Sequence, residues 1–135
     1  MNRASQTLIE SYYAAFNAGD MDALLNLLSE EVVHDINQGP REIGKQAFRV
    51  FLERMNRCYK EQVVDLVVLT SEDGTRAAAE FVVLGEYLCS DEGLPPAHGQ
   101  RYRLPAGAFF EIRDGKVARV TNYYNLQDWI AQVGG

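Results

Sequence analysis

Two adjacent polar residues, His34 and Asp35, follow the apolar pair Val32-Val33. An imidazole exchanges protons near neutral pH, and a carboxylate does so when its pKa is raised, so either residue could act as a general base. Neighbouring residues of a strand point to opposite faces, and at most one of the two should therefore face a pocket. Continuous register favours His34, whereas a bulge would favour Asp35. The alternative is a polar strand end that bonds to backbone or caps the following turn.

Tyr12 is the expected hydrogen-bond donor. It shares one face of a predicted helix with Leu8 and Phe16, so its hydroxyl would point inward and Phe16 would line the same pocket. The alternative is a core aromatic residue whose hydroxyl bonds to the protein. Tyr13, about a hundred degrees further round the helix, is expected to pack elsewhere.

The later strands supply further candidates for binding a ligand. Asn122 and Tyr124 share one side of their strand, where the Asn122 amide could meet a ligand carbonyl or satisfy a polar group of the core. Glu80 is either an inward acid with a raised pKa or, with Glu86, part of a solvated face. Strand alternation also predicts four pocket-lining residues: Tyr102, Leu104, Ala108 and Phe110.

Helical periodicity dominates the first part of the chain and strand composition the second. The pattern predicts a helix over residues 3–18, a second helix capped by Asp20 that carries the leucines up to Leu28, and a third beginning near Gly44. Leu52 lies on the apolar face of the third helix and is expected at the pocket. Strands are predicted at four ranges, namely Val63–Leu69, Arg76–Tyr87, Gln100–Ile112 and Lys116–Tyr124, and a last helix at Leu126–Val133.

This order predicts an α+β fold in one domain, residues 1–135, with helices covering one face of a curved antiparallel sheet so that a cone with a cavity is formed. The two prolines of the long loop over residues 90–99 could stiffen a rim of that cavity, or the loop could be an ordinary surface connection.

Composition excludes several classes of function. With 19 acidic and 13 basic residues and a net charge of −6, the chain lacks the basic patch that nucleic-acid binding requires. No apolar run is long enough to span a membrane and no signal peptide is apparent, so we expect a cytoplasmic protein with no membrane partner. Cys58 and Cys89 lack CxxC or zinc-site spacing and are expected to be buried or half-buried thiols, with no metal site.

Three stretches, YYAAFNAGDMDALLNLLSEEVVHD, REIGKQAFRVFL and FFEIRDGKVARVTNYYN, resemble the nuclear-transport-factor-2-like (cystatin-like) superfamily. The resemblance is to its ketosteroid-isomerase-related and SnoaL-like polyketide-cyclase branch, and it runs over nearly the whole chain. It implies a cone-shaped fold of three N-terminal helices on a curved sheet, with a short C-terminal helix. It also implies a homodimer formed through the outer sheet face near Tyr123.

The resemblance implies that Tyr12 stabilises a developing enolate oxygen and that a base stands on the first strand. This sequence departs from the family's pattern at two positions. One is found by counting along the chain without gaps, and the other by counting back from the last hairpin. The base position falls on Ile36, one residue beyond Asp35, and the position of a second acid falls on Ala108. Because losing one oxyanion donor costs about 2.7–4 kcal/mol of barrier, the family's ketosteroid isomerisation is not expected to be efficient here.

Taken together, these patterns predict a cofactor-free isomerase, cyclase or dehydratase that moves a proton next to the carbonyl of a hydrophobic compound. Tyr12 would stabilise the oxygen, with His34 or Asp35 as the base. The alternative is a non-catalytic domain that binds a hydrophobic ligand or serves as a dimeric scaffold. An epoxide hydrolase would need two acids around an arginine, and the sequence offers no such trio.

Overall fold

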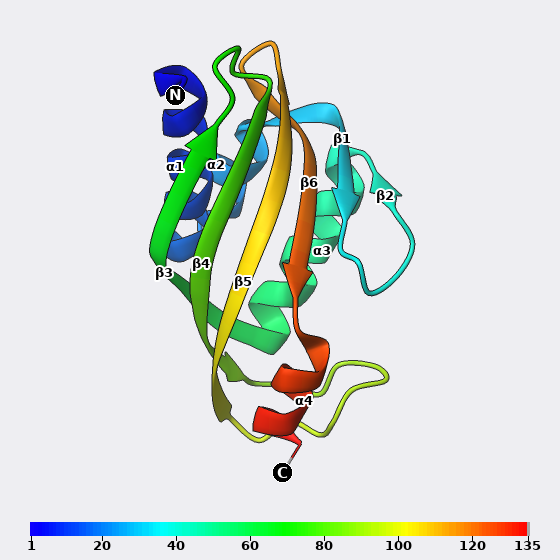
Figure 1. The fold of residues 1–135 in the computed structure, drawn as a ribbon. Coiled ribbons are helices and arrows are strands. Elements are labelled where there is room, and N and C mark those ends of the chain that lie inside the picture. Colours follow the sequence, from blue (N-terminus) through cyan, green and yellow to red (C-terminus); the bar gives the residue numbers. More distant parts are fainter. Residues whose placement is uncertain (135) are drawn as a thin grey trace.

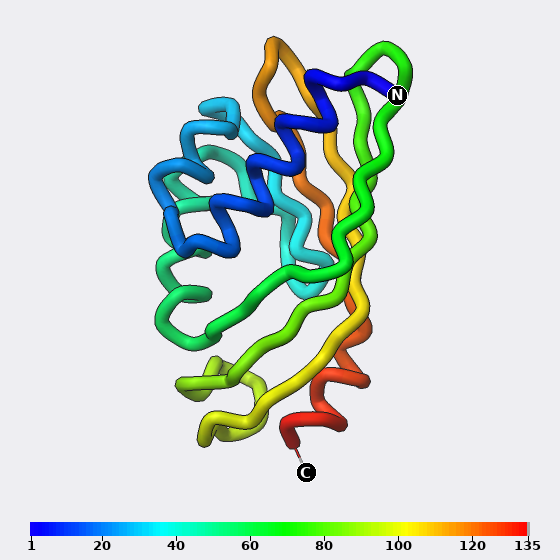
Figure 2. The backbone as a smooth tube through the Cα atoms, turned by 90° about the vertical axis from the view of Figure 1, so that its left-hand side faces the viewer, coloured from blue at the N-terminus to red at the C-terminus, as the bar shows by residue number. Residues whose placement is uncertain are grey.

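We describe residues 1–134 from a computed structural model. Three helices, α1 (Arg3–Ala18), α2 (Met21–Asn26) and α3 (Lys45–Cys58), lie on the concave face of a curved sheet of six strands (Figures 1 and 2). The strands are β1 (Leu28–Asp35), β2 (Glu42–Ile43), β3 (Tyr59–Thr70), β4 (Arg76–Tyr87), β5 (Gln100–Arg113) and β6 (Lys116–Tyr124). A fourth helix, α4 (Leu126–Val133), packs against β5 at the C-terminal end of β6. The expected cone-shaped α+β architecture is confirmed.

The strands are ordered β2-β1-β6-β5-β4-β3 across the sheet, and β1 and β6 run parallel while the other neighbours are antiparallel. The parallel pair was not anticipated, because β1 and β6 lie far apart in the sequence. The β4–β5 register is continuous from Arg76 to Tyr87, so Pro105 and Gly107 introduce no bulge there. One set of alternating side chains therefore faces the helices along the whole of β5.

The boundaries of α1 and α2 follow from their capping residues. The Asn2 side chain accepts a hydrogen bond from the backbone N–H of Ser5, and Gly19 ends α1 in the left-handed conformation with φ of 68°. Asp20 caps α2 through the N–H of Ala23, as expected. The second helix is shorter than predicted, because Leu28 begins β1 and pairs with Val117 of β6.

The core lies between the concave face and the helices. Ile9 of α1, Leu24 of α2 and Phe48 of α3 are almost completely buried, and they belong to the same core cluster as Phe110 and Val120 of the sheet. Within residues 1–134, no helix combines the length and apolar character that crossing a bilayer requires.

Candidate active site

His34 lies on the concave face near the end of β1. Its register partner in β6 is Val120, and only 2% of the residue is exposed. Two aromatic residues of α3 hold the imidazole: the Phe48 ring stacks on it with a centroid distance of 4.4 Å, and the Phe51 ring meets it edge-on at 4.6 Å. The structure therefore puts His34, rather than Asp35, on the inner side.

Asn122 of β6 is the hydrogen-bond partner of this imidazole. Its Nδ2 lies 3.1 Å from Nε2 of His34. An amide nitrogen donates but does not accept, so Nε2 accepts this bond and the neutral ring carries its proton on Nδ1. Nδ1 is sealed from solvent and has no partner among residues 1–134. Burial lowers the pKa of His34 to about 4 against the weaker opposing effect of the Asp35 charge, and the ring is neutral at pH 7.

Asp35 lies on the opposite, outer face of the sheet, so the alternative in which a bulge turns it into the pocket is wrong. Its two oxygens accept hydrogen bonds from Arg41 Nε at 2.7 Å and Arg41 Nη2 at 2.9 Å, and the Thr121 hydroxyl donates at 3.0 Å. These bonds hold the pKa of the carboxyl below its usual value. The only shift of register recorded between β1 and β6 comes before Val33, so no bulge at Asp35 turns it inward.

Tyr12 is buried between α1 and the concave face of the sheet, as its helical spacing predicted. Its ring packs edge-on against Tyr13 at 5.0 Å and Phe110 at 5.5 Å. Tyr13, expected to pack elsewhere, belongs to the same cluster and contacts Phe81; its hydroxyl is sealed without a partner among residues 1–134. Within the same residues no hydrogen bond joins Tyr12 to His34, and the two rings contact different aromatic neighbours. Burial raises the pKa of both tyrosines.

Most of the other predicted residues also lie between the helices and the concave face of the sheet. Five are buried, namely Leu52, Tyr102, Leu104, Ala108 and Phe110, and three are half-buried, namely Phe16, Asn122 and Tyr124. Glu80 is the exception. It pairs with Val67 of β3 and Gly107 of β5 on the outer face and is exposed, so its predicted place in the pocket is wrong.

Glu61, an acid on the concave side of β3, was not among the residues predicted for the site. Helix α3 ends at Cys58 and β3 begins at Tyr59 rather than at Val63, so Glu61 is the third residue of that strand. Its carboxylate accepts a short hydrogen bond from the Tyr102 hydroxyl. The alternation of Tyr59, Glu61 and Val63 was the signal that could have placed it on the inner face.

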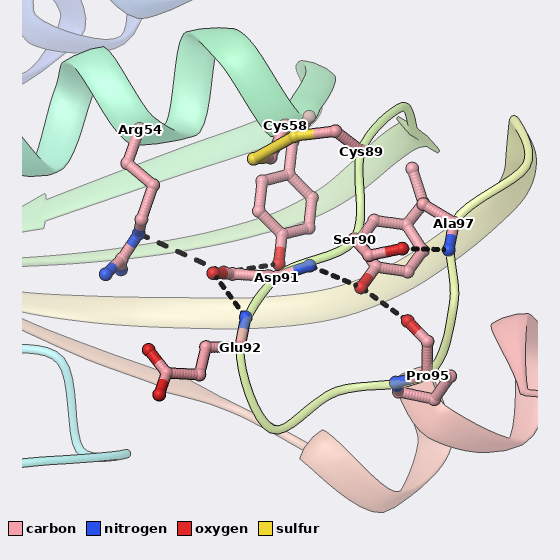
Figure 3. Close-up of a disulfide and its surroundings, with 10 residues drawn as sticks. Arg54, Cys58, Cys89, Ser90, Asp91, Glu92, Pro95 and Ala97 are labelled. Carbon is pink, nitrogen blue, oxygen red and sulfur yellow. Dashed lines mark hydrogen bonds and ion pairs between the residues drawn. A yellow bond between two sulfur atoms is a disulfide. The ribbon is translucent and has the colours of Figure 1, made fainter.

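A second polar group joins α3 to the loop that follows β4. Asp91 Oδ2 accepts a hydrogen bond of 2.9 Å from the Tyr59 hydroxyl and lies 3.9 Å from Arg54 Nε (Figure 3). Neither Asp91 nor Arg54 was anticipated, because nothing in their local sequence indicates that they meet.

Cys58 and Cys89 form a disulfide with a Cα–Cα distance of 4.5 Å (Figure 3), so the expectation of two thiols is wrong. The pairing of Tyr59 with Tyr87 places the residue before β3 beside the residues that follow β4. The disulfide thereby fixes the start of the loop over residues 88–99. Among residues 1–134 no three His, Cys, Asp or Glu side chains are grouped as metal ligands.

The same loop is held by hydrogen bonds to Tyr87. Its hydroxyl donates to the carbonyl of Pro95 at 2.6 Å and accepts from the backbone N–H of Asp91 at 2.9 Å. The Ser90 hydroxyl oxygen accepts from the N–H of Ala97 at 2.8 Å. Hydrogen bonds thus hold the loop over residues 88–99 in place beside Arg54.

A hollow of about 620 Å³ lies on the outer face of the sheet, on the side away from the helices. Its lining includes Glu80, Val82, Pro105 and Tyr123. This surface differs from the inner one on which His34 lies.

The profile of the SnoaL-like domain matches residues 9–120. The chain belongs to the SnoaL-like family. A search of curated proteins finds no match. Among solved structures, a protein of Pseudomonas putida proposed to be a polyketide cyclase is 64% identical, with 96% of this chain and 97% of that chain covered and a TM-score of 0.94.

A protein of Silicibacter, also proposed to be a polyketide cyclase, is 51% identical, with 98% and 97% of the two chains covered and a TM-score of 0.96. A nuclear-transport-factor-2-like protein of Burkholderia xenovorans is 13% identical over 98% of both chains, with a TM-score of 0.77, and shares the fold. The resemblance inferred from the sequence is confirmed.

Proposed function

We propose that this SnoaL-like protein is a cofactor-free enzyme that moves a proton next to the carbonyl group of a hydrophobic compound, with a cyclase- or isomerase-type outcome. The similarity to the proteins of Pseudomonas putida and Silicibacter, both proposed to be polyketide cyclases, supports this class of reaction. The observation that carries the proposal is the unpaired Nδ1 of His34 among residues 1–134. A buried donor without a partner costs about 1–3 kcal/mol, which a ligand oxygen would recover.

In this proposal the neutral imidazole acts as a donor rather than as the base expected from the sequence. A group with a pKa of about 4 is a weak proton acceptor at pH 7. Its Nδ1–H can instead donate to the ligand's carbonyl oxygen and stabilise the negative charge that develops there. Access to Nδ1 requires a shift of the side chains that seal it. Tyr12 of α1, which is buried against the sheet through Phe110, would supply a second donor through its hydroxyl.

The test begins with a thermal-shift screen against a steroid enone, an aromatic polyketide and a long-chain ketone. Turnover of any ligand found is then compared between wild type, His34→Gln and Tyr12→Phe. Loss of one oxyanion donor should lower kcat by about 10²–10³-fold. Asp35→Asn, on the outer face, is the matched control and should leave kcat unchanged.

The second candidate is a non-catalytic domain that binds a hydrophobic ligand. It is favoured by the outward position of Asp35 and by Ala108, which offers no acid where the superfamily's isomerases have one. Ligand binding with no turnover by wild type would support this candidate and refute the enzymatic proposal.

We also propose a homodimer formed through the outer sheet face. Several large apolar side chains are exposed there: Val67, Leu69, Leu84, Phe109 and Tyr123. Covering such a patch by a second copy would remove apolar surface from water. Sedimentation velocity should give a dimer for wild type and a monomer for the double variant Phe109→Glu/Tyr123→Glu; a monomeric wild type would refute the dimer.

A further inference from the structure

Strand β3 is the last strand on one side of the sheet and has β4 as its neighbour on the other side (Figure 1). Its residues 63–70, VVDLVVLT, are mostly apolar and β-branched and carry one charge. Val67 and Leu69 within this stretch are 50% and 58% exposed. An edge strand of such composition is a template on which another strand can pair.

Asn17, near the end of α1, closes this edge at Val63. Its Nδ2 donates to the carbonyl oxygen of Val63 at 2.9 Å, and the backbone N–H of Val63 donates to its Oδ1 at 2.7 Å. A residue that exchanges both backbone hydrogen bonds with one neighbour is the pattern of an antiparallel strand pair. The side-chain amide of Asn17 therefore occupies the positions that a further strand would take.

A second side-chain amide covers the neighbouring position of the edge. Backbone groups that face away from β4 recur at every second residue of a regular strand, so Glu61 is the position before Val63. Nε2 of Gln62 donates to the carbonyl oxygen of Glu61 at 3.2 Å and to that of Asn17 at 2.9 Å. The second bond also ties the end of α1 to β3.

A bulge and the N-terminus interrupt the rest of the edge. Asp65 has a φ of 54° and lies where the pairing with β4 shifts register, between Val64 and Val67. Bulges at a sheet edge disrupt pairing with another strand. At the end of β3, where the N-terminus lies beside it, the backbone N–H of Asn2 donates to the Thr70 hydroxyl oxygen at 2.8 Å (Figure 2).

We propose that Asn17 is an autoinhibitory contact that keeps β3 from pairing with β3 of a second copy of this chain. Two copies of β3 related by a twofold axis would run antiparallel and exchange the backbone bonds that Val63 now makes with Asn17. This edge is separate from the outer sheet face. Pairing through both surfaces would therefore build open-ended assemblies, and Asn17 prevents that growth.

The first test measures amide hydrogen exchange at Val63 by NMR. Asn17→Ala removes the acceptor of this N–H, so its exchange should quicken about tenfold. The matched control is Asn26→Ala, at an exposed asparagine of α2, which should leave the exchange of Val63 unchanged. Unchanged exchange in Asn17→Ala would overturn the inference.

The second test measures association in the background Phe109→Glu/Tyr123→Glu, in which the outer sheet face carries two new charges. Sedimentation velocity should give a monomer for this background at every concentration. Adding Asn17→Ala should give dimers whose fraction rises with concentration, while circular dichroism shows an intact fold. A folded protein that remains monomeric would refute the guarding role of Asn17. Should Asn17→Ala not fold, Asn17→Gln, which keeps an amide on a longer arm, is put through the same two tests.

A pair of lysine substitutions separates strand pairing from general aggregation. A lysine on an edge strand opposes pairing with another strand. Val67→Lys, on β3, should therefore return the associating variant to a monomer. Val50→Lys places the same charge at a similarly exposed position of α3, where 57% of the residue is exposed, and should leave the association unchanged. Suppression by both substitutions, or by neither, would contradict pairing through the β3 edge.

Discussion

Removing the Cys58–Cys89 disulfide should lower the stability of the protein substantially. The bond closes a loop between residues separated by 31 positions. The chain-entropy relation gives a loss of about 12 cal/mol/K for that length, or about 3.7 kcal/mol at 25 °C. With an unfolding entropy of about 2.1 cal/mol/K per residue over the 135 residues, the melting temperature should fall by about 13 °C.

The assay compares wild type, oxidised and reduced, with the double variant Cys58→Ala/Cys89→Ala by urea unfolding and by calorimetry. Reduction should lower the midpoint of wild type to near that of the variant, and the reductant should not affect the variant. Hydrogen exchange of the loop should also quicken on reduction, although the bonds from Tyr87 would still hold part of it. Equal unfolding free energies for oxidised and reduced wild type would refute the reasoning.

Three further predictions concern buried and paired groups. The folded pKa of His34 lies below the unfolded value, so unfolding takes up a proton as pH falls from about 6.5 to 4. Urea unfolding should show up to about 3 kcal/mol of stability lost over that range, and less in His34→Gln. Tyr13→Phe removes a sealed hydroxyl without a partner among residues 1–134 and should leave stability unchanged or raise it by about 1 kcal/mol, measured by calorimetry. Asp35→Asn breaks the pair with Arg41 and should lower the melting temperature only slightly in the same assay, because the exposed Arg41 side chain is screened by solvent.

Strand alternation predicted the inner face of β5 correctly, because the β4–β5 register has no bulge. It also favoured His34 over Asp35 as the inward residue. Local patterns were sufficient in these places because each strand has one buried and one exposed face.

The errors arose where distant pairing decides the structure. Leu28 was assigned to a helix from its leucine-rich surroundings, but it pairs with Val117, 89 positions later. The Cys58–Cys89 bond depends on the pairing of β3 with β4, and the meeting of Glu61 with Tyr102 crosses three strands. Such contacts leave no signal in the spacing of nearby residues.

The parallel pairing of β1 with β6 has a consequence for how the protein is made. His34 and Asn122 are separated by 88 positions, so a ribosome must release most of the chain before their hydrogen bond can form. Contacts of such long sequence separation slow folding, because the intervening chain must first be brought together. The surroundings of the His34 imidazole would accordingly be among the last parts of the molecule to fold during synthesis.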